Sequence, residues 1–240
     1  MNNKNVTYIG EKSIEFELQR KNVKNINLRI RPDLSVVVSA NSRVPYDYIE
    51  RFVQEKSGWI LRKIENFNGF QNANGKKEYV SGETIRYLGR QYRLRVRESD
   101  KEDAKFYKGY IYIYVKDKND YKKKEKLFYK WLQEKAEEAF HDSLARMYPL
   151  IGKYGVKEPS IKIRRMKTRW GSCSQNSHSI TLNLDLVKAP KACIDYVLLH
   201  ELIHFKYRNH NKQFYNFLTA LMPDWKERKE ILDSEVGREL

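Results

Sequence analysis

Two histidines four residues apart, with a glutamate directly after the first, constrain this chain more than any other feature. They are His200, Glu201 and His204, at the start of the segment HELIHFKYRNH, residues 200–210. On an α-helix this spacing places two side chains about 40° apart around the axis and one turn apart along it, so both imidazoles reach one ion. Glu201 projects about 100° away from His200, beside the pair. A helix carrying this segment therefore predicts a divalent-metal site.

The same residues include the two kinds of group that a catalytic zinc site requires, which are metal ligands and a general base. Neutral imidazoles bind the cation, one position stays open for water, and a carboxylate takes the proton as the water attacks. Residues 190–203 supply a suitable helix, because Pro190 fits a first turn and an apolar stripe follows it. We predict Zn²⁺, or another divalent metal, as the cofactor and Glu201 as the general base.

A third ligand is needed, and His210 is the first candidate. If the helix continued past His204, His210 would lie about 120° off the metal face and about 9 Å farther along the axis. The chain must therefore turn between Phe205 and Asn209, and Asn209 tolerates the left-handed backbone conformation that a turn can use. The competing ligands are two carboxylates of the next expected helix, Glu227 and Glu230.

The chain is strongly basic, with 47 Lys and Arg against 31 Asp and Glu and a formal net charge of +16. Such a charge favours encounter with anionic partners. A run of basic residues without an acidic one precedes the metal motif, between residues 161 and 170. His178 follows in a polar loop. The candidates for substrate binding are therefore Arg164, Lys167, Arg169 and His178.

The pattern of apolar residues predicts an α+β fold. Strands are expected at 14–18, 26–30, 34–40, 84–88, 92–96 and 106–115, with a helix from Pro45 to Ile64 and a loop at 67–77. A long helix should run from about 118 to Met147. Strands at 160–164 and 179–184, an irregular segment at 166–174 and helices from Pro190 follow. We place a boundary between a strand-rich region, 1–117, and a helical catalytic region, 118–240.

Three tyrosines in YIYIYV, at positions 110, 112 and 114, share one face of an expected strand. A pleated, half-buried surface explains them better than a platform for base stacking. Base stacking needs a matching basic groove, and a linear sequence does not display one.

Two cysteines, Cys173 and Cys193, exclude a disulfide scaffold. No stretch approaches the roughly 20 apolar residues of a membrane span. The first residues, MNNKNVTYIGEKS, lack the apolar segment of a secretory signal. We therefore expect a soluble cytoplasmic protein without a membrane partner.

Four segments, MKTRWGSCS, ITLNL, DYVLLHELIHFKYRNHNKQF and MPDWKERK, together resemble the YgjP-like metallopeptidase family, which is related to the SprT-like and WLM zinc peptidases. The resemblance implies a zincin-like catalytic half, in which a small sheet packs on the helix that bears His200, Glu201 and His204. It also implies His210 as third ligand and TRWGSC close to the cleft. Peptidase activity is the label of the family, and nucleotide pyrophosphate hydrolysis has also been proposed within it.

Three functions follow as hypotheses. The first is peptide hydrolysis, with an extended peptide pairing along Ile180–Leu184 and Arg169, Tyr207 or His178 stabilising the oxyanion. The second is hydrolysis of a nucleoside triphosphate, with the basic run neutralising phosphate charge. The third is a nucleic-acid-binding module with a structural zinc, against which the glutamate argues. The sequence leaves the oligomeric state open.

Overall fold

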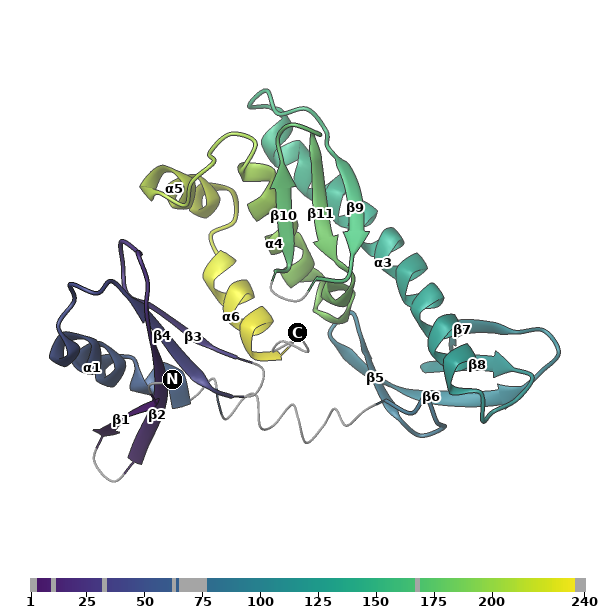
Figure 1. Cartoon of the computed structure of the whole chain (residues 1–240). Helices are drawn as coiled ribbons and strands as arrows, with labels where there is room; N and C mark the ends of the chain where they lie inside the picture. Colours follow the sequence, from purple (N-terminus) through teal and green to yellow (C-terminus); the bar gives the residue numbers. More distant parts are fainter. Residues whose placement is uncertain are drawn as a thin grey trace. The chain divides into compact units, whose positions relative to one another are not determined.

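The computed structural model describes residues 4–9, 12–31, 34–61, 64, 77–166 and 169–235. Packing divides the chain into two compact units, essentially residues 1–75 and 76–236, which are described one at a time. Each unit combines helices with small sheets, so the predicted α+β class is confirmed (Figure 1). In the described residues, no helix has both the length and the apolar character needed to cross a bilayer.

The first unit is a four-stranded sheet with helix α1 (Tyr46–Glu55) and a further helical stretch at 57–61. Its strands run in the order β1-β2-β4-β3, and β2 and β4 are parallel. Phe16, Val38, Ile49 and Val53 belong to its core, which buries one face of the sheet with α1. The strand bounds are β1 (Lys4–Ile9), β2 (Lys12–Arg20), β3 (Asn27–Ile30) and β4 (Val36–Ala40).

Strand β1 escaped prediction because its polar residue faces inward. Thr7 is fully buried and donates to Glu50 Oε1 at 3.1 Å, while Val6 and Tyr8 are exposed. The usual alternation is therefore inverted in this strand. The loop predicted at 67–77 lies outside the described residues except for Lys77.

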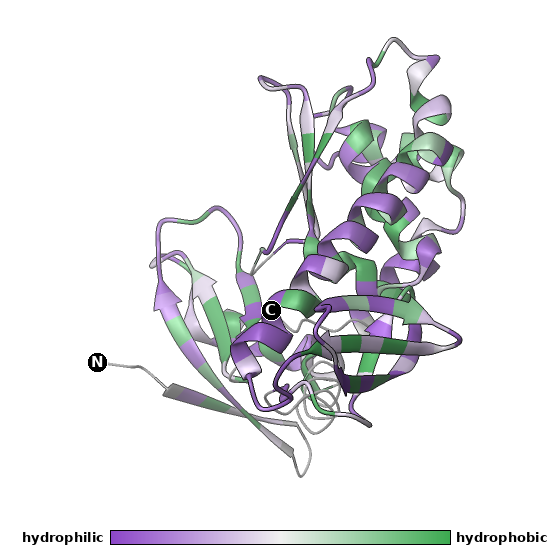
Figure 2. Cartoon of the chain, turned by 90° about the vertical axis from the view of Figure 1, so that its right-hand side faces the viewer, coloured by the Kyte–Doolittle hydropathy of each residue, from purple (hydrophilic) through white to green (hydrophobic). Residues whose placement is uncertain are grey.

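The second unit begins with a sheet of order β5-β6-β8-β7. The tight turns after β5 and β7 place Gly89 and Gly109 at φ values of 77° and 78°, where a side chain would be strained. Figure 2 shows hydrophobic and hydrophilic residues alternating along these strands. The predicted strands are confirmed as β5 (Thr84–Tyr87), β6 (Arg90–Glu98), β7 (Asp103–Tyr107) and β8 (Tyr110–Val115).

The long helix α3 (Tyr121–Gly152) covers the apolar face of this sheet with buried side chains that include Phe128, Trp131 and Leu132. Asp120 caps its first turn by accepting from the Lys123 backbone N–H at 2.9 Å. The helix extends five residues past the predicted end at Met147. Pro149 lies within the added turn, and fully buried Ile151 holds that turn in the core.

A second sheet of the same unit has the order β10-β11-β9, so β11 is its central strand. The segment 166–174 was predicted to be irregular, and this is wrong for its last part. Residues Gly171–Ser174 form β10, paired with β11 from Gly171 opposite Leu182 to Ser174 opposite Ser179. Small polar residues gave no apolar alternation to detect. The bounds are β9 (Ser160–Arg164), β10 (Gly171–Ser174) and β11 (Ser179–Asn183).

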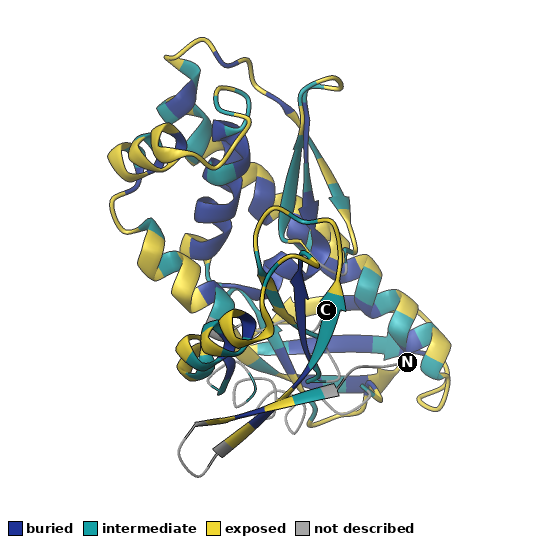
Figure 3. Ribbon diagram, turned by 60° about the vertical axis from the view of Figure 1, so that its left-hand side comes forward, coloured by how far each residue is buried: buried dark blue, intermediate teal, exposed yellow. Residues whose placement is uncertain are grey.

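After a short 3₁₀ turn, η1 (Leu184–Lys188), three helices complete the unit, as predicted. They are α4 (Lys191–Ile203), α5 (Lys212–Leu221) and α6 (Trp225–Glu235). Helix α4 is buried along nearly its whole length, and its buried residues include Asp195 and Glu201 as well as the apolar ones (Figure 3).

The turn between β5 and β6 connects the sheet β5-β6-β8-β7 to the start of α4. Backbone N–H groups of Leu88 and Gly89 donate to Val187 and Lys188 carbonyls at 2.9 and 3.0 Å. A Cβ on Gly89 would lie 2.8 Å from Pro190 Cγ, so only glycine permits this approach. Both sheets, α3 and α4 thus share one core. Packing separates the chain nearer residue 75 than residue 117. The boundary between 1–117 and 118–240, with the first region as a possible wall of the cleft, stays a prediction.

Candidate metal centre

The three histidines of the segment 200–210 converge at the end of α4. Their ligand atoms all lie within 4.8 Å of one another. Within the described residues this is the only group of three or more His, Cys, Asp or Glu side chains close enough to hold one ion. Neither Glu227 nor Glu230, the competing ligands on α6, belongs to it.

Helix α4 ends just before His204, which occupies the C-cap position. The backbone N–H groups of residues 204–207 then donate to carbonyls of Glu201, Leu202 and Ile203, which closes a turn. This turn begins one residue earlier than expected. Asn209 does not adopt the left-handed conformation proposed for it, since its φ is not positive. A hydrogen bond from Asn211 N–H to the Asn209 carbonyl, at 2.8 Å, folds that part of the chain instead.

Helix α5 supplies the wall behind the three imidazoles. Asn211 caps this helix by accepting from the Phe214 N–H at 3.0 Å. Phe214 is fully buried, and its ring centroid lies 4.8–4.9 Å from the centroids of His200, His204 and His210. One apolar side chain therefore restricts all three rings.

The ring nitrogens are oriented as a metal site requires. His204 Nδ1 lies 3.0 Å from the Tyr207 carbonyl, which can only accept, so Nδ1 carries the proton and Nε2 keeps a free lone pair. His200 Nε2 and His210 Nε2 lie 2.8 Å apart, so these two ring nitrogens face each other. The buried Nδ1 of His200 has no hydrogen-bond partner in the described structure. The set of donors fits a divalent cation such as zinc.

Burial also keeps two of these imidazoles neutral. It lowers the pKa of His200 to about 3, with further lowering from His204, His210 and Lys229. Burial likewise lowers the pKa of His204, and hydrogen bonds that its ring donates to backbone groups of Tyr207 and Arg208 oppose this lowering. Neutral imidazole is the form that binds a metal.

Glu201 lies beside the cluster and is 7% exposed. Burial raises its pKa to about 7, while the Arg169 charge and a hydrogen bond from backbone Cys173 lower it. A carboxylate in this position exchanges protons near neutral pH, as a general base must.

Strand β10 packs directly on this carboxylate because residue 171 is glycine. A Cβ on Gly171 would lie 2.7 Å from Glu201 Cγ and 2.8 Å from Oε1. Cys173 follows two residues later on β10, and a backbone group of Cys173 bonds Glu201. Burial raises the pKa of the Cys173 thiol to about 12. This thiol therefore stays protonated and is no nucleophile at neutral pH. Neither cysteine forms a disulfide.

Asn183, at the end of β11, holds the chain that leads into β10. Its side-chain amide donates to the carbonyls of Met166 and Arg169 at 2.8 and 3.0 Å. Its Oδ1 accepts from the N–H groups of Met166 and Asp185 at 3.3 and 3.2 Å. The residue is fully buried, so these four bonds satisfy the amide completely and fix the backbone at Arg169.

A cleft of about 500 Å³ opens over the histidines and Glu201. Beyond those residues, its lining is Arg169, Gly171, Ser172, Cys173, Gln175 and Arg208. Gln175 donates to the His204 carbonyl at 2.8 Å and accepts from Arg208 Nε at 2.7 Å, which ties the β10–β11 turn to the histidine loop. Gln175, Arg208 and Asn183 could not be identified from the sequence, because their roles depend on tertiary contacts.

The other predicted substrate residues lie elsewhere or outside the description. Arg164 ends β9 and does not line the cleft, and Lys167 lies outside the described residues. His178 occupies the β10–β11 turn with φ 44°, 3.0 Å from the Lys157 carbonyl and 4.5 Å from the Phe205 ring. It is not in the lining. Among the described candidates for substrate binding, Arg169 alone lines the cleft.

The strand Ile180–Leu184 was expected to pair with an extended peptide, and this is wrong. Most of it is β11, which already pairs with β10 on one side and β9 on the other. Its backbone groups therefore have no free side. Strand β10, at the edge of the sheet and against Glu201, has one.

Fold and site together define an α+β protein with a candidate metal centre beside a buried carboxylate. The chain belongs to the YgjP-like family, because its sequence matches the YgjP-like metallopeptidase domain over residues 24–235. This membership makes it a metal-dependent hydrolase of a metallopeptidase family, which implies a catalytic metal and a peptide substrate. No curated protein matches the chain.

Two solved structures are similar in part. One is the metallopeptidase zymogen abylysin of Pyrococcus abyssi, with 22% identity, a TM-score of 0.38, and 42% of this chain and 98% of that chain covered. The other is the metallopeptidase zymogen jannalysin of Methanocaldococcus jannaschii, with 24% identity, a TM-score of 0.35, and 40% and 96% covered. At these TM-scores the likeness carries no argument about activity.

Proposed function

We propose that this chain is a zinc peptidase in which His200, His204 and His210 hold the ion and Glu201 is the general base. The observation that supports this most is the position of Glu201, nearly buried beside three imidazoles whose ligand atoms lie within 4.8 Å of one another. A structural zinc site has no use for such a carboxylate and normally fills all four positions with protein ligands. The nucleic-acid module with a structural zinc is therefore disfavoured for this site.

Bound between the imidazoles, zinc supplies Lewis acidity towards the attacking water and the scissile carbonyl. Glu201 accepts the proton of the water on a carboxylate oxygen and later returns it to the leaving nitrogen. Arg169, which lines the cleft and whose charge lowers the pKa of Glu201, would stabilise negative charge that develops on the carbonyl oxygen. We assign the oxyanion role to Arg169 because Tyr207 and His178 do not line the cleft.

The free edge of β10 is the proposed docking place for the substrate. Within the described residues this strand pairs only with β11, so its outer N–H and C=O groups, apart from the Cys173 backbone group that bonds Glu201, are open to an extended chain. An added peptide strand would pass directly over Glu201, which Gly171 allows β10 to approach. Backbone pairing gives affinity for unfolded segments with little dependence on their sequence.

Hydrolysis of a nucleoside triphosphate is the second candidate, because two arginines, Arg169 and Arg208, line the cleft. Guanidinium groups recognise phosphate by charge-assisted hydrogen bonds. Against this candidate, the described residues of the cleft include no glycine-rich phosphate loop, and three histidines suit zinc better than the magnesium that phosphoryl transfer normally uses.

One experiment separates the two candidates. Zinc-loaded protein is offered an unfolded protein and a set of nucleoside triphosphates side by side, with Arg169→Gln tested against Arg164→Gln as a matched control outside the cleft. A peptidase cleaves the polypeptide, and Arg169→Gln lowers its turnover by about 10²-fold through loss of one oxyanion donor. Release of phosphate or pyrophosphate without peptide cleavage would reject the peptidase proposal.

A further inference from the structure

The outer face of the sheet β5-β6-β8-β7 carries rings and charges that the proposed peptidase site does not use. Three arginines of β6 lie directly opposite three tyrosines of β8. Residues opposite each other in neighbouring strands share one face, and the alternate residues of these strands face the core with α3. We call this surface the arginine–tyrosine face, made by Arg93, Arg95, Arg97, Tyr110, Tyr112 and Tyr114.

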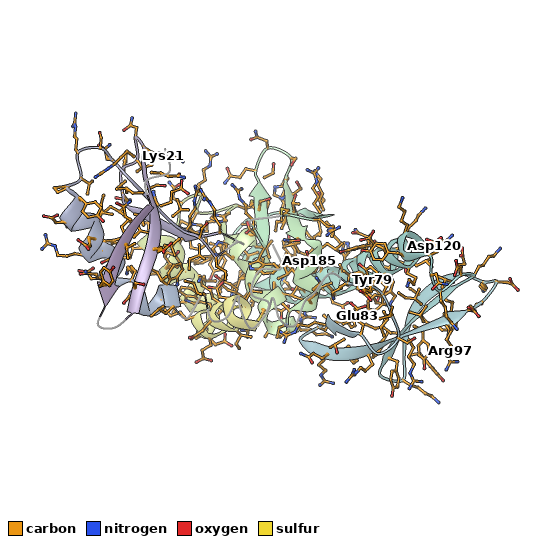
Figure 4. All side chains as sticks on the ribbon, turned by 60° about the horizontal axis from the view of Figure 1, so that its bottom comes forward. Lys21, Tyr79, Glu83, Arg97, Asp120 and Asp185 are labelled. Atoms are coloured by element: carbon orange, nitrogen blue, oxygen red, sulfur yellow. The ribbon has the colours of Figure 1, made fainter. Side chains whose placement is uncertain are left out.

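Two of the three arginines of this face lie over tyrosine rings, whereas Arg93 donates to the Gly82 carbonyl at 2.7 Å. The guanidinium carbon of Arg95 is 3.6 Å from the ring centroid of Tyr110, and that of Arg97 is 5.3 Å from the centroid of Tyr112. Tyr112 is only 8% exposed as a result. Figure 4 shows Arg97 on the side of the sheet away from Tyr79, which packs on α3. Guanidinium planes therefore form the outer layer of the surface.

Strand β7 extends the surface on its far side. Lys105 and Tyr107 lie opposite Tyr112 and Tyr110, and so share their face. The ammonium of Lys105 is 5.0 Å from the Tyr114 ring centroid. Tyr107 is 53% exposed, which makes it the most accessible ring of this surface. The sheet thus presents planar groups and positive charge together.

The charge of the face is not neutralised by the protein. No carboxylate of the described residues forms an ion pair with Arg93, Arg95 or Arg97. Asp103 is the one acidic residue that the strand register places on this face, opposite Tyr114. Guanidinium groups without acidic partners, in a chain of net charge +16, favour an anionic ligand.

We propose that the arginine–tyrosine face binds single-stranded nucleic acid. Unpaired bases stack on guanidinium planes and on aromatic rings, and phosphates are neutralised by Arg and Lys. An anionic membrane or an acidic peptide offers charge but no planar group to stack, so it would use only half of this surface. From the sequence alone a half-buried surface explained the tyrosines better than a stacking platform, because the basic residues beside them lie on a different strand, β6.

The test is the binding of a fluorescein-labelled dT₁₅ oligonucleotide to the full chain, followed by anisotropy between 50 and 200 mM salt. The triple substitution R93Q/R95Q/R97Q is expected to weaken binding by about 10²-fold and to reduce the slope of log K against log salt by about 2. The control K122Q/K126Q/K130Q removes the same charge from exposed positions of α3 and should weaken binding far less.

Two further variants test stacking separately from charge. The triple substitution R93K/R95K/R97K keeps the charge, so the salt slope should persist while affinity falls several-fold. Tyr107→Ala, at an exposed position, should weaken binding by about tenfold. Equal losses in the β6 and α3 glutamine triples, or Tyr107→Ala binding like wild type, would overturn the proposal in favour of diffuse attraction to the basic surface. Absence of binding at 50 mM salt would overturn it outright.

Discussion

The histidine cluster and the arginine–tyrosine face lie in the same unit, but different kinds of contact position their side chains. The cluster depends on residues from α4, α5, β10 and the turn before α5, many of them buried. The face depends on the register of two neighbouring strands, and its outer groups are largely accessible. A metal-binding pocket needs buried neighbours to orient each ring, whereas a stacking surface needs only regular spacing. Substitutions around the two regions should therefore differ sharply in their effects.

The largest effect is expected for Glu201→Gln. The amide cannot accept the proton of the attacking water, so turnover should fall by about 10³-fold while bound zinc is unchanged. Glu227→Gln is the matched control, because Glu227 is an exposed glutamate on α6 outside the cluster. Peptide turnover and zinc content measured on the same samples check this. Full turnover by Glu201→Gln would remove Glu201 from the mechanism.

Gly171→Ala should come next. The new Cβ would lie 2.7 Å from Glu201 Cγ, so either β10 or the carboxylate must shift. We expect kcat to fall by about 10- to 100-fold, since small displacements of a reacting group have effects of this size. Gly58→Ala adds a methyl group with no atom within 4 Å and should change nothing. Unchanged kcat in Gly171→Ala would mean that the position of β10 does not matter to the reaction.

Asn183→Ala tests the buried support of the site through stability. Loss of the side chain leaves buried backbone groups near Met166 and Arg169 without partners, which should lower the free energy of unfolding by about 2–4 kcal/mol. Asn176→Ala, in the exposed β10–β11 turn, should change it by less than about 0.5 kcal/mol. Denaturant unfolding measures both. A loss below 1 kcal/mol in Asn183→Ala would show that the 166–169 segment is held by other contacts.

The smallest effect is expected on the arginine–tyrosine face. Arg97→Gln removes an exposed side chain with one ring contact, so the free energy of unfolding should change by less than about 0.5 kcal/mol. Turnover of a short peptide should stay within about twofold of wild type, because this face does not line the cleft. A marked loss of peptide turnover would break the separation of the two regions.

The two regions also differ in how far they could be predicted from the sequence. The α4 segment has local signals, an apolar helix with His200, Glu201 and His204 at helical spacing. Alternating residues predicted β6 and β8 as strands, but not the parallel pairing that brings their arginines and tyrosines together. Strand β10 could not be predicted, because Gly-Ser-Cys-Ser has no apolar pattern and becomes a strand only by pairing with β11. The importance of Gly171 and Asn183 arises from contacts with residues far along the chain.

Some errors have the same origin. Ile180–Leu184 has a clear strand pattern, and the pattern does not say whether a strand lies at an edge or in the centre. The turn that returns His210 was expected from geometry, but its backbone conformation at Asn209 was not, since hydrogen bonds from residues 204–207 and 211 determine it. Local pattern predicts elements, and tertiary contacts decide which of them reach the cleft.

The central claim, that three imidazoles hold one divalent ion, is tested most directly by the zinc content of the purified protein after loading and dialysis. We expect about one zinc per wild-type chain. We expect the same in His141→Ala, which changes an exposed histidine of α3, and little or none in His200→Ala. No zinc in the folded wild-type protein, or equal zinc in all three, would contradict the account.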